Sequence, residues 1–348
     1  MLSGELMMIG PLNQKLLRDI VNIKAQIAAI ILVMAAGIAV FIIMFGVLDS
    51  LKLTKKTYYE RYQFADIFAS LKRAPESIKN RIDDIPGVSV SQTRISFGMT
   101  LNIPSMIEPA SGKILSVPDT HSSPLNQLYL HSGRMLHPNE ENAILADQGF
   151  FEAHNFRLGD KLSVTLNGHL RKLKVVGVVL SPEYIYSIAP GALMPDNKRY
   201  GIFWMSRSSL AALTNMKGAF NDLTIKTERH AKLNNIILNV DQILAPYGGL
   251  LAYDRSTQLS NFFVENELKQ LYSMGMMAPM IFLSVAAFLV NVVMSRQIAT
   301  QREQIGMLKA IGYSNLEVSN HYLKLVLLIV VMGALLGLFL GTWMGAGM

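Results

Sequence analysis

The stretch REQIGMLKAIGYSN, Arg302 to Asn315, separates two long uncharged runs near the end of the chain. A linker between two membrane helices needs only a few polar residues, yet this one carries charges, two glycines and regularly spaced apolar residues. Its first part, Arg302 to Ile311, is predicted to form a short amphipathic helix. Gly312 is typical of a helix C-terminal cap, and Ser314 with Glu317 has the spacing of a capping box that begins the next helix.

The uncharged runs indicate a membrane protein. Of the 348 residues, 51% are hydrophobic and only 16% are charged, whereas an average soluble domain has about 25% charged residues. Charged side chains are absent from residues 27–48, 270–295 and 325–348. Because about 20 apolar residues cross the hydrocarbon core, we predict transmembrane helices at 25–48, 270–295 and 318–348. The first run is too long for the apolar part of a signal peptide, so we interpret it as a retained anchor.

Basic residues flank the predicted spans on one side of the membrane. Those before the first span and between the second and third are Lys15, Arg18, Lys24, Arg296, Arg302 and Lys309. By the positive-inside rule both segments are cytoplasmic, and residues 49–269 lie on the opposite side. The net charge of +7 is thereby explained without a nucleic-acid partner. The chain contains no cysteine, which excludes disulfides and thiolate metal sites.

Residues 1–24 contain an amphipathic segment, PLNQKLLRDIVNIK. Its apolar face carries Leu12, Leu16, Leu17, Ile20 and Ile23, and the polar residues Lys15, Arg18, Asp19 and Asn22 lie opposite. We predict a short cytoplasmic helix that lies in the membrane surface. The alternative is that this segment simply extends the first span.

Residues 49–269 are predicted to form an α+β domain. The first β-α-β unit has strands at 64–71 and 88–103 around a helix at 75–84; the second has strands at 220–226 and 250–254 around a helix at 233–244. The two units flank the domain, so we expect them to form one subdomain. The insert between them, about 104–215, is predicted to be mostly β. Within it Asn167-Gly168 indicates a type I′ hairpin turn, and the apolar phase suggests a bulge between Leu170 and Leu173.

No catalytic or metal-binding set is predicted. The sequence has no P-loop of the form G-x-x-x-x-G-K-[ST], no H-E-x-x-H and no G-x-S-x-G. His131 and His137 do not have the spacing of metal ligands. In the loop SPEY, Glu183 and Tyr184 are candidate ligand contacts, although a packed turn is the favoured interpretation.

Three glycines recur at every fourth residue of the last span. Gly333, Gly337 and Gly341 form a small-xxx-small face that permits close helix contact. Packing within the subunit and dimerisation both fit this pattern.

The opening stretch also resembles a known family. Its residues Arg302, Glu303, Ile305, Gly306, Leu308, Lys309, Ala310, Gly312 and Ser314 are similar to the signature R-E-I-G-x-L-[KR]-A-x-G of FtsX-like (MacB-type, type VII) ABC transporter permeases. The predicted order of anchor, large outer domain, second span, signature and third span agrees with that family. The segments GDKLSVTLNG, VVGVVLSPEY and PYGG resemble the N-terminal unit of large tandem-domain members. The family unit has a fourth span, so the chain looks truncated.

The resemblance implies a non-enzymatic permease subunit of the cell (inner) membrane, with its N-terminus in the cytoplasm and a periplasmic domain. A separate cytoplasmic ATPase would use ATP and Mg, and the chain itself would bind no cofactor. The segment 296–317 would hold the coupling helix, with Arg302, Glu303, Ile305, Gly306, Leu308, Lys309 and Gly312 as coupling residues. Among these, Glu303, Ile305 and Leu308 are the foremost candidates.

Family members are exporters or mechanotransmission complexes that act on lipoproteins, lipids, peptides or drugs, or that activate cell-wall hydrolases. The implied partners also include a second permease half or the remainder of the protein, membrane lipids and a periplasmic accessory protein. The alternative is a membrane-anchored sensor or scaffold whose outer domain binds a ligand or a cell-wall hydrolase without any ATPase.

Overall fold

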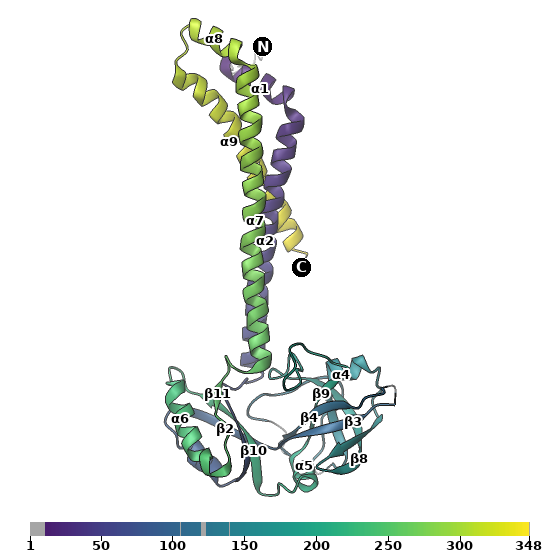
Figure 1. Ribbon diagram of the computed structural model, residues 1–348. Helices are drawn as coiled ribbons and strands as arrows, with labels where there is room; N and C mark the ends of the chain where they lie inside the picture. Colours follow the sequence, from purple (N-terminus) through teal and green to yellow (C-terminus); the bar gives the residue numbers. More distant parts are fainter. Residues whose placement is uncertain (1–10, 105, 120–122, 139, 348) are drawn as a thin grey trace, which may run out of the picture. The chain divides into compact units, whose positions relative to one another are not determined.

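The computed structural model describes residues 11–347 except 105, 120–122 and 139, and it divides into two units (Figure 1). The helical unit comprises the residues up to 53 and those from 267 onward, and the α+β unit comprises residues 54–266. Residues 1–10 of the predicted interfacial segment lie outside the described part of the chain.

The helical unit contains the predicted spans. Its helices are α1 (Pro11–Asn22), α2 (Lys24–Arg61), α7 (Leu259–Thr300), α8 (Arg302–Ala310) and α9 (Asn315–Gly345), and α2 and α7 both continue into the α+β unit. By length and composition α2, α7 and α9 are able to cross a membrane. The predicted fold class, three apolar helices with an α+β domain, is therefore confirmed.

Helix α1 differs from its predicted arrangement. It is separated from α2 at Ile23, so it does not simply extend the first span. Its inner face carries the half-buried side chains of Lys15, Leu16 and Ile20 and the buried carboxylate of Asp19. The prediction that Lys15 and Asp19 point away from the apolar face was wrong, because partners from other helices surround them. The outer face instead exposes Leu17 (55%) and Val21 (63%), which suits contact with a membrane surface.

The glycine stripe of α9 packs against α2. A Cβ added to Gly337 would lie 2.7 Å from the Cβ of Ile38 and 2.9 Å from the carbonyl oxygen of Ala35, closer than van der Waals contact allows. The three contacts are Gly333 on Met34, Gly337 on Ile38 and Gly341 on Ile42. Of the two roles that the pattern left open, the structure shows packing within the subunit.

We expect Gly337→Ala to destabilise the helical unit. The added methyl group must push α9 away from α2, and overpacking of this kind costs about 1–3 kcal/mol. Thermal unfolding of the full-length chain in detergent measures the loss. The matched control is Gly46→Ala in α2, where a Cβ meets nothing within 4 Å. Equal unfolding temperatures for the two variants would contradict the packing role.

In the α+β unit the two predicted β-α-β units share one four-stranded antiparallel sheet with the order β11-β1-β10-β2. Its elements are β1 (Ile67–Pro75), α3 (Ile78–Asp83), β2 (Val88–Arg94), β10 (Ala219–Thr227), α6 (Leu233–Leu244), the short 3-10 helix η1 (Ala245–Tyr247) and β11 (Tyr253–Asp254). Ile78 and Ile82 of α3 and Ile236 and Val240 of α6 belong to the same core as the strands, so both helices cover one face of the sheet. This is a split β-α-β arrangement.

The insert forms a second sheet that closes on itself. Its elements are β3 (Ser96–Asn102), β4 (Ala110–Val117), β5 (Tyr129–Gly133), β6 (Ala143–Asp147), α4 (Gln148–Ala153), β7 (Lys161–Leu166), β8 (His169–Leu180), β9 (Tyr200–Ser206) and α5 (Arg207–Leu213). The strand order is β5-β8-β6-β9-β4-β3-β7, and the additional pairing of β7 with β8 closes a barrel.

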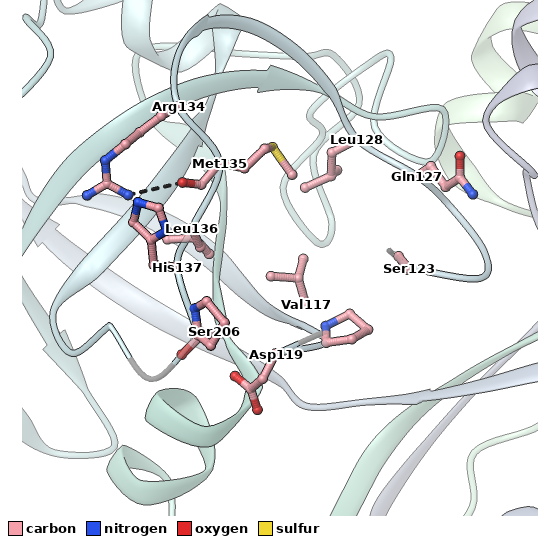
Figure 2. A pocket seen from close by; sticks show the side chains of 12 residues that line it. Val117, Asp119, Ser123, Gln127, Leu128, Arg134, Met135, Leu136, His137 and Ser206 are labelled. Carbon is pink, nitrogen blue, oxygen red and sulfur yellow. Dashed lines mark hydrogen bonds between the residues drawn. The ribbon is translucent and has the colours of Figure 1, made fainter. Parts of the chain in front are cut away.

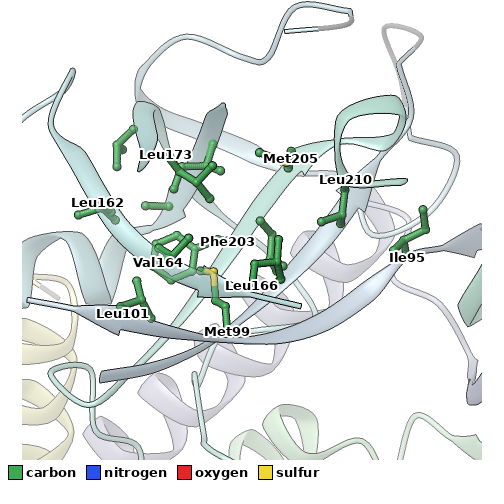
Figure 3. Packing of buried hydrophobic residues seen from close by; sticks show 14 of the residues in the cluster. Ile95, Met99, Leu101, Leu162, Val164, Leu166, Leu173, Phe203, Met205 and Leu210 are labelled. Atoms are coloured by element: carbon green, nitrogen blue, oxygen red, sulfur yellow. The ribbon is translucent and has the colours of Figure 1, made fainter. Parts of the chain in front are cut away.

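The barrel encloses an apolar core (Figure 3). Buried side chains alternate along β7, where Leu162, Val164 and Leu166 face this core, as their spacing predicts. Strand β3 belongs to the barrel, so the insert's sheet starts upstream of the predicted boundary at 104. The predicted single strand run 88–103 is divided at Ile95, where the chain passes from one sheet to the other.

The β7–β8 hairpin has the predicted turn but not the predicted bulge. Asn167 and Gly168 both have positive φ, 50° and 77°, as a type I′ turn requires. The register of β7 with β8 runs without interruption from Lys161↔Lys174 to Leu166↔His169. Leu170 is simply exposed (64%), which produced the apparent change of phase.

Asp147 caps α4 and holds the long loop that follows β8. Its Oδ2 accepts hydrogen bonds from the Phe150 N–H at 3.4 Å and from the Ser187 hydroxyl at 3.3 Å. Burial raises the pKa of Asp147 from 3.8 to about 6, and these hydrogen bonds only partly offset that effect.

Asp147 should make the stability of the chain fall as the pH rises from about 4 to 6. Because its pKa is higher in the folded state, the folded chain holds the proton more tightly than the unfolded chain. The resulting stability is fully present below pH 3.8 and is lost through pH 6, and the shift corresponds to at most about 3 kcal/mol.

Asp147→Asn keeps a capping oxygen and removes the titration, so this component of the pH dependence should disappear. Denaturant unfolding of the full-length chain between pH 4 and 7, followed by tryptophan fluorescence, measures it. Asp196→Asn is the control, since the Asp196 side chain is 54% exposed. An unchanged pH profile in Asp147→Asn would contradict the assignment.

Candidate functional site

Helix α8 is the short helix between the last two spans. Glu303 lies in its first turn and Lys309 in its last, and both charges interact favourably with the helix dipole. At its end the Gly312 N–H donates to the Lys309 carbonyl and the Tyr313 N–H donates to the Leu308 carbonyl, each at 3.1 Å. Gly312 has φ of 108°, so the helix ends in the Schellman geometry expected from the sequence.

Helix α9 begins with the predicted capping box. The Ser314 hydroxyl accepts a hydrogen bond from the Glu317 N–H at 3.3 Å, and the Ser314 N–H donates to the Glu317 carboxylate at 2.8 Å. The reversal between α8 and α9 is therefore fixed by local hydrogen bonds, and these determine where α8 ends.

The two faces of α8 are chemically different. Ile305 packs into the core of the helical unit with Tyr313, and Leu308 is half-buried. The exposed face carries Met307 (60%) and, at the cap, Ile311 (78%). Their helical spacing suggests that Ile305, Leu308 and Ile311 are all available to a partner or to the membrane surface; in the structure only Ile311 is exposed, and Ile305 and Leu308 are half-buried.

The charged coupling candidates lie on the exposed part of α8. Arg302, Glu303 and Lys309 are all exposed. Within the part of the chain that the structure describes, none of the three forms an ion pair. Lys309 also lines a groove of about 600 Å³ between α7, α8 and α9, together with Met294, Ile298, Ile305, Val318 and Tyr322 among others.

Gly306 packs against none of the described residues of the chain. A Cβ placed on it would meet nothing within 4 Å, and the residue is exposed. A glycine in the middle of a helix costs roughly 0.5–1 kcal/mol relative to alanine. The described contacts of the chain do not account for this cost.

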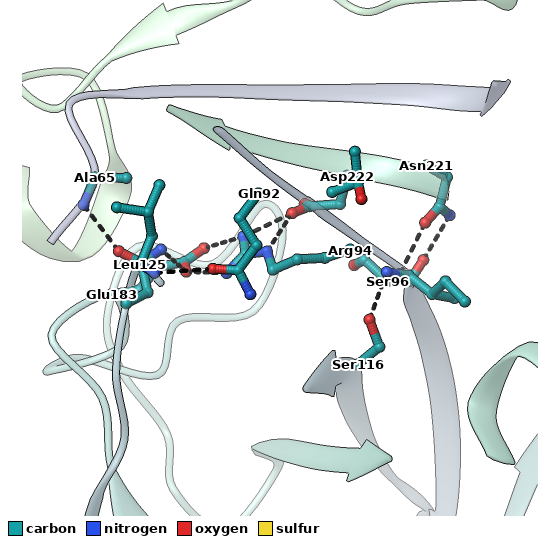
Figure 4. A network of polar contacts seen from close by, with 12 residues as sticks. Ala65, Gln92, Arg94, Ser96, Ser116, Leu125, Glu183, Asn221 and Asp222 are labelled. Atoms are coloured by element: carbon teal, nitrogen blue, oxygen red, sulfur yellow. Dashed lines mark hydrogen bonds and ion pairs between the residues drawn. The ribbon is translucent and has the colours of Figure 1, made fainter. Parts of the chain in front are cut away.

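In the α+β unit, the candidate ligand residue Glu183 serves a structural role. Its carboxylate accepts hydrogen bonds from both Nη groups of Arg94, at 2.5 and 2.9 Å, and from the side-chain amide of Asn126 at 2.6 Å (Figure 4). Arg94 also donates from Nε to Asp222 at 2.7 Å. Glu183 is only 4% exposed, so its carboxylate is committed to the protein interior, which agrees with the favoured interpretation of a packed turn and not with the candidate ligand contact.

This buried cluster joins the two sheets. Arg94 ends β2 of the four-stranded sheet, Asp222 lies on β10, and Glu183 follows β8 of the barrel. Burial is the largest single effect and raises the pKa of the Glu183 carboxyl, but the charge and hydrogen bonds of Arg94, with smaller effects of Lys113 and Tyr184, together outweigh it, so the net direction is downward. Tyr184 is half-buried and packs edge-on against Trp204 at 6.2 Å.

Arg94→Ala should destabilise the α+β unit strongly. The change leaves two buried carboxylates without their cation, and breaking a buried pair in this way costs about 3–5 kcal/mol. Denaturant unfolding of the full-length chain measures the loss.

The control is Arg134→Ala, which removes an exposed bidentate pair with Glu140. An exposed pair contributes only about 0–1 kcal/mol. Similar losses from the two substitutions would show that the Arg94 cluster has no special role.

A pocket of about 430 Å³ lies at the barrel (Figure 2). Its charged groups are already paired: Arg134 binds Glu140, and Asp119 accepts hydrogen bonds from the Ser208 N–H and hydroxyl. His137 is the one histidine among the described residues that line the pocket. In the described part of the chain no group of three or more His, Asp or Glu side chains is placed to hold a metal.

The helical unit contains long apolar helices, of which α7 and α9 are linked by the short helix α8. Residues 276–348 match the FtsX-like permease C-terminal domain. The matched residues contain most of α7 and all of α8 and α9. No curated protein matches the chain.

Solved structures with similarity to the chain are domains of transporters and permeases. The extracellular domain of the noncanonic ABC-type transporter YknZ from Gram-positive bacteria is 13% identical, with coverage of 55% of this chain and 98% of that one and a TM-score of 0.34. The periplasmic region of MacB from Actinobacillus actinomycetemcomitans is 11% identical, with coverage of 62% and 98% and a TM-score of 0.35. A domain of a permease protein from Porphyromonas gingivalis is 12% identical, with coverage of 57% and 90% and a TM-score of 0.28.

Proposed function

We propose that the chain is the transmembrane permease subunit of an ABC-type exporter or mechanotransmission complex. A separate cytoplasmic ATPase would bind ATP and Mg and would dock on the exposed face of α8. The observation that carries this proposal is that α8 lies inside the matched segment and presents exposed apolar side chains and charges that form no ion pair with the described residues. The outer domain would respond by moving, and would act on a lipoprotein, lipid, peptide or drug.

The distribution of basic residues supports a cytoplasmic position for α1 and α8. The basic residues of α1 and of the α7–α8 segment belong to two segments that contact one another, since Lys15 of α1 hydrogen-bonds to Gln301. Both segments therefore lie at the same end of the helical unit. By the positive-inside rule this end is cytoplasmic, and residues 54–266 are extracytoplasmic. A second permease half, or the remainder of a longer protein, and a periplasmic accessory protein would complete the assembly.

Gly306 supplies an independent argument for a docked partner. Its lack of a side chain is not required by any described contact within the chain, and it costs helix stability. A partner whose backbone approaches α8 closely would require the position to stay small. This requirement predicts that a small side chain at position 306 raises the stability of the helix, whereas a large one weakens association with the partner.

Gly306→Ala should stabilise the chain by about 0.5–1 kcal/mol, whereas Gly306→Leu should weaken association with the ATPase at least tenfold, which is about 1.4 kcal/mol. Thermal unfolding measures the first effect. Titration of the purified ATPase onto the permease in nanodiscs measures the second. The matched control is Gly46→Leu, at a helical glycine that also has nothing within 4 Å.

The ATPase itself is identified by photo-crosslinking in native membranes. A photoreactive amino acid at position 307 should capture a protein that carries a P-loop, and the same group at position 194, also an exposed methionine, should not. If no nucleotide-binding protein is captured from position 307, the ATPase-coupled function is wrong. An outer domain that binds a ligand or a hydrolase without an ATPase, as in a sensor or scaffold, would then be favoured.

A further inference from the structure

A buried polar cluster lies where α8 begins. It joins residues from three separate parts of the helical unit: Lys15 and Asp19 of α1, Gln301 between α7 and α8, and His321 and Tyr322 of α9. The Asp19 carboxylate is the centre of the cluster. It accepts hydrogen bonds from Lys15 Nζ at 2.8 Å and Gln301 Nε2 at 2.7 Å, and His321 Nε2 lies 3.1 Å from it.

Gln301 is held from both sides. Its amide nitrogen donates to Asp19, while its carbonyl oxygen Oε1 accepts from Lys15 Nζ at 2.6 Å and from the Tyr322 hydroxyl at 3.0 Å. Gln301 is the single residue between the end of α7 and the start of α8, and its backbone carbonyl accepts the hydrogen bond from the Ile305 N–H. The position of this side chain therefore sets the point from which α8 departs.

Apart from the half-buried Lys15, the cluster is closed to solvent. Asp19 is 3% exposed, and Gln301, His321 and Tyr322 are also buried. Burial raises the pKa of Asp19, but the hydrogen bonds from Lys15, Gln301 and His321 lower it below its ordinary value. A buried carboxylate that loses such partners is left uncompensated, so α1 and the α7–α8 junction are held in one mutual position.

An apolar contact alone would not require this arrangement. Leu16, Ile20 and Ile23 already pack α1 against the core of the helical unit. Apolar surfaces slide over one another with little preference for one register, whereas a satisfied buried network fixes a single arrangement. The apolar residues stabilise the contact between α1 and the rest of the helical unit, and the polar cluster fixes the relative position of the helices in that contact.

We propose that the Asp19 cluster is a positioning device that links α8 to α1, so that a displacement of α8 is transmitted to the interfacial helix and to the start of α9. Asp19 and Gln301 are its positioning residues. The source of the displacement, an ATPase docked on α8, rests on the proposed function, but the mechanical link itself does not.

Distance measurement tests the link without any ATPase. Because the sequence has no cysteine, spin labels attach only at introduced cysteines, and Val21→Cys on α1 with Met307→Cys on α8 places both labels at exposed positions. Electron–electron double resonance on the full-length chain in nanodiscs should give one narrow distance distribution. Asp19→Asn and Gln301→Ala should each broaden or shift it, and the double variant should add little to either single change.

Asp83→Asn is the matched control, since it removes a surface Lys–Asp pair with the same four-residue spacing in the α+β unit. It should leave the distribution unchanged. Unchanged distributions in both Asp19→Asn and Gln301→Ala overturn the inference, and so do strictly additive effects in the double variant. These outcomes leave the proposed docking of an ATPase intact, because capture at position 307 reports on docking separately.

The functional readout separates positioning from general structure. With the ATPase identified as above, Asp19→Asn should retain ATPase association within about twofold while stimulated ATP turnover falls on the order of 10- to 100-fold, as expected for a positioning error. Equal losses of association and turnover would indicate a merely structural role and would overturn the inference. A failure to capture any ATPase at position 307 refutes the proposed function and leaves the distance measurement as the test of the link.

Discussion

The close approach of α9 to α2 is the constraint on which the helical unit depends. At Gly337 the two backbones are separated by less than the space that one methyl group needs. This contact fixes the position of α9 along α2, and α9 in turn carries His321 and Tyr322 into the polar cluster. The direction in which α8 leaves Gln301 is thus decided by helix packing along the span together with hydrogen bonds at its end.

Features that depend on neighbouring residues were predictable from the sequence, and features that depend on distant partners were not. The spans followed from the absence of charge, and the ends of α8 and α9 followed from Gly312 and the Ser314–Glu317 pair. Helical periodicity sorts residues by polarity, so it placed Asp19 on the solvent side. Its actual environment requires Gln301 and His321, which lie far away in the chain.

The burial of Glu183 also depends on partners that are distant in the sequence. A glutamate in a loop rich in turn-forming residues suggests a surface, and only the three-dimensional position of Arg94 and Asn126 shows that its carboxylate is buried. The pair arises because the chain leaves the four-stranded sheet at Arg94 and enters the barrel at Ser96, so that a cation is carried into the junction. No sequence pattern indicates that a charged residue lies where the chain passes from one sheet to another.

The two faces of α8 impose separate requirements on one short sequence. Ile305 and the preceding Gln301 are fixed from inside the unit, whereas Glu303, Gly306 and Met307 face outward and meet no constraint from the described chain. Selection that acted only on folding would favour alanine over glycine at position 306, because alanine is the better helix former. Helix α8 is held from within by Gln301, the residue before its start, and its outer face carries a glycine and charged side chains, so it is suited to receive a force on one side and transmit it through the other.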